Sequence, residues 1–213
     1  MTKKFYKETG MYIDWKQINK LPNIDTLIDI GVGPSGTPDL YKHFINSKLI
    51  LIDPLDVSRN YAKNLGKYRD VTFYQCALGK TNGHKLLNIT KDFGNSSLLK
   101  VAEINYKYSP IKKKIVQLKQ LDKLLINKER LGKIGIKVDV EGFELDVIKG
   151  ASETLQYTKF LIAEVRHNHE SFQKLYKMHE FINLMHKNHF VLTMILTAKP
   201  FIADLCFQPC KSS

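Results

Sequence analysis

The stretch from Thr26 to Gly36, with the sequence TLIDIGVGPSG, constrains the fold more than any other part of the chain. Its first five residues are mainly apolar and β-branched, which predicts a short buried strand. The three glycines that follow have the spacing G-x-G-x-x-G, which predicts a tight turn where the backbone can come close to a ligand. A helical pattern follows the turn. Strand, glycine-rich turn and helix form the start of a βαβ unit, and free N–H groups at the start of such a helix favour a negatively charged ligand group.

A second predicted strand, Lys48–Ile52, ends in Asp53, where a carboxylate can accept hydrogen bonds from both hydroxyls of a ribose. Two nucleotide cofactors, NAD and S-adenosylmethionine, fit a glycine-rich turn with such an acidic residue. Asp29 favours the second cofactor. A carboxylate about 5 Å from a pyrophosphate costs a few kcal/mol at an effective dielectric constant of about 20, whereas next to an ammonium and a sulfonium it is favourable. A strand, turn and helix without any ligand remains the structural alternative.

Length and composition predict one globular domain. The chain has 213 residues, of which 43% are hydrophobic and 25% charged. We expect a single domain over residues 1–213, with an N-terminal entry segment at 1–25 and a Rossmann-like core at 26–208. The sequence has no run of eighteen apolar residues and no signal-peptide core, so we expect a cytoplasmic protein without a membrane span.

The formal net charge is +12, and the densest basic block is Lys112–Lys114. Such a charge suggests an anionic partner, such as nucleic acid, an acidic glycan or a membrane face. The alternative is that lysines simply cover solvated faces. No nucleic-acid reading motif is evident, so we do not expect nucleic acid as a partner. The three cysteines give neither a disulfide framework nor a zinc spacing, and Cys76 is interpreted as a small core residue.

Strands that alternate with helices predict an α/β protein with a doubly wound, mostly parallel sheet of about seven strands and an antiparallel edge strand. One hairpin is predicted through Asn82-Gly83, between strands at Val71–Leu78 and Lys85–Ile89. The polar segment 90–111 is expected to be a functional or mobile loop. The remaining expected strands are 115–118, 134–138, 160–163, 190–196 and 201–207, and the expected helices are 14–19, 56–65, 121–126, one after Glu144, and a long one containing Phe172 and Met185.

Acidic residues are predicted at the carboxyl ends of four separate strands, where ligands bind in open α/β sheets. These residues are Asp29, Asp53, Asp139, Glu141 and Glu164. In a protein of charge +12 their convergence predicts a locally negative crevice that suits a cationic cofactor.

The segment Lys137–Ala151, with the sequence KVDVEGFELDVIKGA, resembles the FkbM family of S-adenosylmethionine-dependent methyltransferases. That family shows a Lys-hydrophobic-Asp-x-Glu-Gly-x-Glu run and then a helix that ends in Lys-Gly-Ala. The resemblance covers about residues 26–195. Two departures are Val32-Gly33-Pro34, where the family often has Ala-Asn, and Asp53-Pro54, where it commonly has Glu-Pro.

The resemblance implies a class I methyltransferase fold and methyl transfer, mostly to oxygen, on sugars, glycolipids or natural products. It also implies cofactor roles: Asp29, Gly31 and Gly33 would hold the amino-acid end, Asp53 the ribose, and the Cys76-Ala77 backbone the adenine. Asp139 joins them as a predicted cofactor-binding residue. The implied acceptor is a small molecule or glycan precursor, which the surface lysines suggest could be anionic.

A hydroxyl acceptor is a poor nucleophile, so a base close to it would accelerate the transfer by about 10²–10⁴-fold. The candidates are Glu141, Glu164 and His167. Glu141 could instead cap the following helix, and His167 could be an ordinary surface histidine. Together with Asp139 the three could also converge on a divalent metal, which is possible but is not predicted.

Two other functions remain open at this point. An NAD-dependent dehydrogenase acting on a nucleotide sugar would use the glycine spacing and Asp53, but it leaves Asp29 and residues 139–144 unexplained. A basic nucleic-acid-binding domain on a degenerate Rossmann-like scaffold would use the charge alone. The oligomeric state is not predicted.

Overall fold

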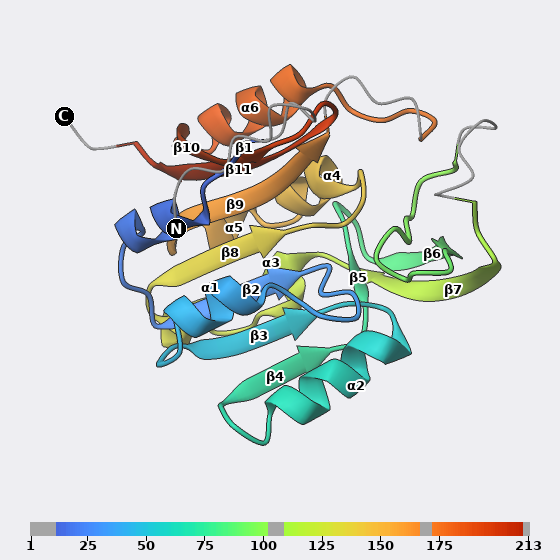
Figure 1. The fold of residues 1–213 in the computed structure, drawn as a ribbon, viewed down its shortest axis with the longest axis horizontal. Helices are drawn as coiled ribbons and strands as arrows, with labels where there is room; N and C mark the ends of the chain where they lie inside the picture. Colours follow the sequence, from blue (N-terminus) through green and yellow to red (C-terminus); the bar gives the residue numbers. More distant parts are fainter. Residues whose placement is uncertain (1–11, 102–108, 167–171, 211–213) are drawn as a thin grey trace.

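The computed structural model describes residues 12–101, 109–166 and 172–210, which form an α/β fold with two sheets (Figure 1). Within these residues the main sheet has eight strands in the order β1-β10-β11-β9-β8-β2-β3-β4. Its strands are β1 (Tyr12–Ile13), β2 (Thr26–Ile30), β3 (Lys48–Ile52), β4 (Val71–Tyr74), β8 (Ile134–Val138), β9 (Thr158–Arg166), β10 (Phe190–Ala198) and β11 (Ile202–Pro209). The small sheet contains β5 (Ala77–Leu78), β6 (Gly83–Ile89) and β7 (Lys112–Lys119), in the order β5-β7-β6.

The predicted doubly wound, mostly parallel sheet is confirmed. Strands β4, β3, β2, β8 and β9 are parallel neighbours, and β11 runs antiparallel between β9 and β10. The short β1 pairs antiparallel with β10 at the sheet edge. From β2 the chain moves to β3 on one side and later to β8 on the other. The strand order therefore reverses between β2 and β8, which is where open α/β sheets bind their ligands.

Helices cover both faces of the main sheet (Figure 1). Alternating residues of β2 explain this, since Ile28 and Ile30 belong to one apolar cluster and Leu27 belongs to the other. The first face is covered by α3 (Leu121–Leu124), α4 (Glu144–Lys149), α5 (Ser152–Leu155) and α6 (Met178–Lys187), and the second by η1 (Trp15–Lys20), α1 (Pro38–His43) and α2 (Asp56–Leu65); η3 (Lys128–Leu131) precedes β8. None of the helices in the described ranges is long and apolar enough to cross a bilayer.

The predicted hairpin at Asn82-Gly83 is wrong. The expected strand Val71–Leu78 is divided into β4 in the main sheet and β5 in the small sheet. Strand β6 pairs with β7, which lies between β5 and β6. The chain does reverse its direction at Asn82-Gly83. However, the strand that pairs with β6 is β7, which begins more than twenty residues after β6 ends.

Two other expectations need correction. The long helix predicted to contain Phe172 begins only at Met178, and Phe172 and Tyr176 are buried in the segment before it. Their apolar spacing reflects packing against the core rather than a helical turn. Glu164 lies inside β9, because this strand continues to Arg166.

Candidate functional site

A cavity of about 260 Å³ lies at the carboxyl ends of β2, β3 and β8. Its wall combines the glycine-rich turn, the end of β3, the start of the small sheet and part of the segment that follows β6. The lining residues are Ile30–Thr37, Ile52–Leu55, Cys76–Leu78, Leu87, Phe93, Gly94, Ser96, Leu98 and Asp139–Glu141. The cavity thus lies at the topological switch point of the main sheet.

The glycine-rich turn is held tightly between the neighbouring strands. Gly31 has φ +86°, donates its N–H to the carbonyl of Ile52 at 2.9 Å, and lies so close to β8 that a Cβ would overlap the carbonyl oxygen of Asp139. Gly33 has φ +57°, but the nearest atom to a Cβ there would be 3.9 Å away, in Gly94. Gly31 is therefore required for strand packing, whereas Gly33 is required only for the shape of the turn.

Asp53 connects the end of β3 to this turn. One carboxylate oxygen accepts the N–H of Gly33 at 2.9 Å and the other accepts the N–H of Leu55 at 2.7 Å. Burial raises the pKa of Asp53, and the backbone donors oppose this shift. Each carboxylate oxygen has a second acceptor position, so the side chain can also accept hydroxyl groups from a ligand in the cavity.

Asp29 is not among the residues that line the cavity. Its carboxylate accepts hydrogen bonds from the hydroxyls of Tyr41 and Thr37, both at the α1 side of the sheet. Burial raises the pKa of Asp29 to about 6, with the hydrogen bond from Tyr41 opposing the shift. The side chain thus connects β2 to α1 beneath the glycine-rich turn.

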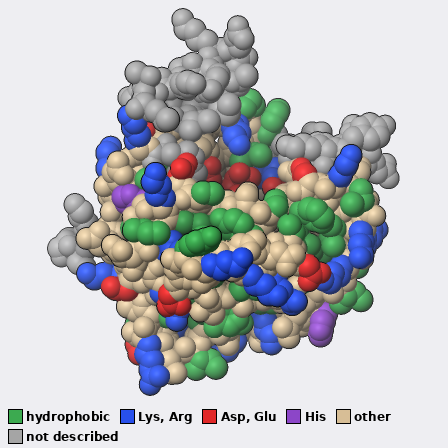
Figure 2. All heavy atoms as spheres, turned by 60° about the horizontal axis from the view of Figure 1, so that its bottom comes forward, with side chains coloured by type: hydrophobic (Ala, Val, Ile, Leu, Met, Phe, Trp, Pro, Cys, Tyr) green, Lys and Arg blue, Asp and Glu red, His purple; other side chains and the backbone are tan. Residues whose placement is uncertain are grey.

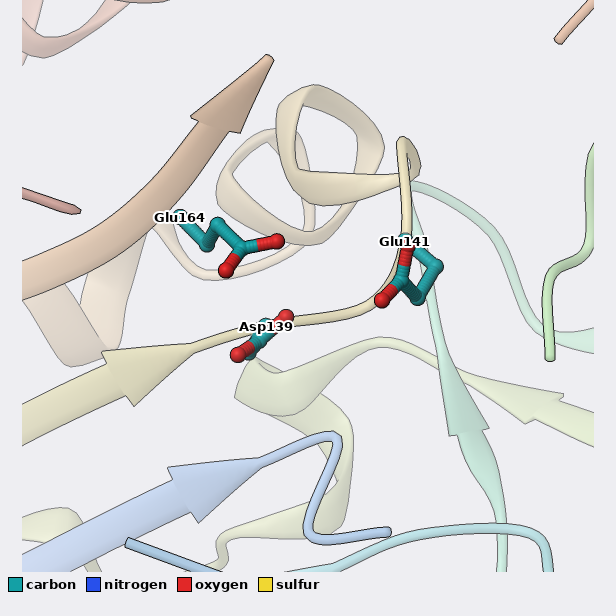
Figure 3. A group of neighbouring side chains, drawn as sticks. All are labelled: Asp139, Glu141 and Glu164. Carbon is teal, nitrogen blue, oxygen red and sulfur yellow. The ribbon is translucent and has the colours of Figure 1, made fainter. Parts of the chain in front are cut away.

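Three acidic side chains converge beside the cavity, as Figure 3 shows for Asp139, Glu141 and Glu164. Each offers a carboxylate oxygen within 4.8 Å of those of the other two. Burial, and next the charge of Asp139, raise the pKa of Glu164 to about 8. Figure 2 shows acidic side chains at the bottom of a hollow in a face that otherwise carries many lysines. Three of the five acidic residues predicted to form a negative crevice therefore converge here, and Asp53 lines the same cavity.

Two buried cations balance part of this charge. Arg166 contacts the carboxylate of Glu141 and lies 3.5 Å from that of Glu164. Lys137 Nζ lies 3.0 Å from Asp204 and 3.4 Å from Asp139. Burial alone would lower the pKa of Lys137, but the charges of Asp139, Asp204 and Glu164 together raise it. Both cations are at most 3% exposed, so their charges interact strongly with these carboxylates.

The loop after β8 is held in an unusual conformation. Glu141 has φ +55°, which costs a residue with a side chain about 1–2 kcal/mol. One carboxylate oxygen of Glu144 accepts the N–H groups of Val140 and Gly142, and the other accepts the hydroxyl of Tyr176. Ser97 donates its hydroxyl to the carbonyl of Glu141 at 2.7 Å. These four hydrogen bonds stabilise the loop that carries Glu141.

The structure brings most of the predicted site residues together. Asp53, Cys76, Ala77, Asp139 and Glu141 line the cavity with both predicted glycines. Asp29 and Glu164 are not part of this lining, and His167 lies outside the described residues. Burial raises the pKa of the Cys76 thiol to about 11, which fits its interpretation as a neutral, buried side chain.

Several charged or hydroxyl-bearing residues of the site had no predicted role, among them Lys137, Arg166, Tyr41 and Glu144. A signal existed for Lys137, since it is the only charged residue in the apolar strand Ile134–Val138 and a buried charge needs a partner. No comparable signal identifies Tyr41, whose partner is twelve residues away on another element.

Residues 26–192 match the family model described as the methyltransferase FkbM domain. No curated protein matches the chain. An inferred S-adenosylmethionine-dependent methyltransferase from Listeria monocytogenes is similar in structure, with 12% identity, 93% of this chain and 97% of that chain covered, and a TM-score of 0.54. A protein of the NADB-Rossmann superfamily from Streptococcus agalactiae also has 12% identity, with 93% and 68% covered and a TM-score of 0.50. At these identities the two structures support the fold alone.

Proposed function

The chain belongs to the FkbM methyltransferase domain family, and from this premise we propose that it transfers the methyl group of S-adenosylmethionine to a hydroxyl oxygen of a sugar, glycan precursor or natural product. The observation that carries the proposal is the position of Asp53 and Asp139 on one cavity beside the glycine-rich turn. A carboxylate at the position of Asp53 suits the ribose of either cofactor, whereas one at the position of Asp139 suits a cationic amino-acid end and would repel a pyrophosphate.

The residues that line the cavity fit this cofactor. Asp53 is oriented by two backbone N–H groups and can accept ribose hydroxyls. Cys76, Ala77 and Leu78 offer a small apolar surface for a flat base next to the end of β3. Asp139 and Glu141 supply negative charge at the β8 side of the cavity. Cofactor cavities typically combine a mainly apolar wall with a few fixed polar groups in this way.

S-adenosylmethionine, when bound, supplies an electrophilic methyl group on a positively charged sulfur. The contribution of the protein is to hold an acceptor oxygen in line with that group, and such positioning can lower a barrier by about 7–11 kcal/mol. A buried base must also receive the acceptor proton. Of the described candidates, Glu141 is fixed by its contact with Arg166 and by a strained backbone, which suits a structural role.

Glu164 is the base in this proposal, since its carboxylate, although outside the cavity lining, lies within 4.8 Å of those of Asp139 and Glu141, which line the cavity. Its raised pKa of about 8 makes the ionised carboxylate a stronger proton acceptor than an ordinary glutamate, and methyl transfer should accelerate as the pH rises toward 8 and the carboxyl group ionises. Lys137 and Arg166 would stabilise the ionised form before the proton arrives. His167 remains a candidate outside the described residues.

The cofactor assignment is tested by thermal shift with S-adenosylmethionine, S-adenosylhomocysteine and NAD. A ligand at 100 times its Kd stabilises the folded state by about 2.7 kcal/mol, so binding raises the melting temperature measurably. We expect a shift with both adenosyl compounds, a reduced shift in Asp53→Asn, and an unchanged shift in the control Asp39→Asn, which alters an exposed residue of α1. Stabilisation by NAD alone would contradict the proposal.

The acceptor class is tested separately with a radiolabelled methyl donor. Transfer to hydroxyl compounds, such as sugars, and not to their amino analogues would support O-methylation. Label that appears only on amino groups would leave the cofactor assignment intact but refute the acceptor. The cytoplasmic location and the single domain over residues 1–213 remain predictions.

A further inference from the structure

The small sheet presents an apolar face to solvent on the side away from the cavity. Leu86 in β6 lies directly opposite Ile115 in β7, and their side chains are 45% and 70% exposed. Ile111, just before β7, is 67% exposed. The alternate residues Leu87 and Val116 are buried and belong to the apolar cluster beneath the sheet. The exposed residues therefore form the second face of a sheet whose first face is already covered.

Lysines are interleaved with these side chains. Lys113 is two residues from both Ile111 and Ile115, so its exposed side chain lies on the same face of the small sheet as theirs. Lys112 is exposed beside it, and Lys114 forms an ion pair with Asp56 at 3.2 Å. We use "outer face" for His84, Leu86, Ile111, Lys113, Ile115 and Gln117 together. In Figure 2 hydrophobic and basic side chains lie side by side on the right of the molecule, where the small sheet lies in Figure 1.

The outer face also lies close to the cavity. The parallel strands of the main sheet point toward the small sheet, as Figure 1 shows. Leu87, the neighbour of Leu86 in β6, lines the cavity itself. A surface that bound the outer face would therefore be separated from the cavity by the small sheet alone.

We propose that the outer face binds the surface of an anionic lipid bilayer. Exposed aliphatic side chains enter the boundary between headgroups and acyl chains, while neighbouring lysines bind anionic headgroups. Aliphatic side chains next to lysines do not suit a nucleic acid, because stacking on bases needs aromatic side chains and the outer face presents leucine and isoleucine. Binding to the bilayer does not depend on methyl transfer, so it can be tested independently of the proposed function.

The test is co-sedimentation with vesicles of phosphatidylcholine alone and of phosphatidylcholine containing one third phosphatidylglycerol. We expect binding to the anionic vesicles that weakens as salt increases, and little binding to the neutral ones. Each lysine near an anionic surface contributes about fivefold in affinity, so Lys113→Gln on the outer face should weaken binding about fivefold, and Lys112→Gln/Lys113→Gln, which also removes the exposed charge beside it, by up to about 25-fold. Ile111→Ser/Ile115→Ser should also weaken binding to the anionic vesicles. The loss caused by this variant should persist at high salt more than the loss caused by the lysine variant.

Matched controls are available at the other end of the molecule. Lys16→Gln/Lys20→Gln removes the same charge from exposed positions of η1, and Ile126→Ser removes an isoleucine that is 79% exposed. Both should bind as the unaltered protein does. Equal losses in the two lysine pairs would mean non-specific attraction and would overturn the proposal. The same holds if the unaltered protein ignores anionic vesicles or binds single-stranded RNA in preference to them.

Discussion

Replacing Gly31 by alanine should destabilise the protein far more than the same change at Gly33. Both glycines have positive φ, which costs alanine about 1–2 kcal/mol at either position. At Gly33 the nearest protein atom to the new Cβ is 3.9 Å away, so no further cost is expected. At Gly31 the Cβ overlaps the carbonyl of Asp139, and separating β2 from β8 costs about 1–3 kcal/mol more, as other overpacked sites do.

The free energy of unfolding should therefore fall by about 2–5 kcal/mol in Gly31→Ala and by about 1–2 kcal/mol in Gly33→Ala. Urea denaturation with two probes, tryptophan fluorescence and circular dichroism, measures both values and checks for two-state unfolding. In a chain of this size the melting temperature should fall by about 2–4 °C per kcal/mol. Equal losses in the two variants would refute the reasoning, since only the contact with Asp139 distinguishes them.

Two further predictions concern the buried charges. Arg166→Met leaves the carboxylates of Glu141 and Glu164 without their shared cation, and it should lower the free energy of unfolding by about 3–5 kcal/mol, as measured in urea; a loss under 1 kcal/mol would contradict the importance of the contact. The raised pKa of Glu164, about 8 against an ordinary 4.5, means that the folded state binds the proton more tightly than the unfolded chain. Its contribution to stability is complete below pH 4.5 and is lost as the pH rises to 8, so urea midpoints should fall over this range and fall less in Glu164→Gln. Asp29 and Glu144, with pKa values raised by burial to about 6 and 7, act in the same direction, as does Asp53, and an identical slope in Glu164→Gln would assign the effect to these other carboxyl groups.

The sequence was most informative where a charged residue follows the end of an apolar strand. Asp53 and Asp139 could be placed on one cavity because parallel strands present their carboxyl ends on the same edge. The orientation of Asp29 was harder to predict, although it follows from the alternation of side chains along β2. Asp29 shares a face with Leu27, which packs on the side of α1. A strict use of this alternation would have pointed its carboxylate toward α1.

Pairings between distant segments could not be predicted. The turn before β6 is visible in the sequence, but the choice of β7 as its partner depends on how the small sheet packs on the main one. In the same way, nothing local to Arg166 or Glu141 indicates their contact, which joins two strand ends through the folded sheet. Periodicity assigns side chains to faces, whereas partners are decided by the tertiary structure.

The pairing of Lys137 with Asp204 has a consequence for the limits of the functional unit. Similarity to the family ends at residue 192, but Asp204 lies beyond that point, on β11. A shortened protein designed from the matched region would remove the inserted antiparallel strand and would expose an edge of β9. It would also leave the buried ammonium group of Lys137 without its nearer ion-pair partner, Asp204. Domain boundaries for expression should therefore keep the ion pair between Lys137 and Asp204, and any shortened version should extend past β11.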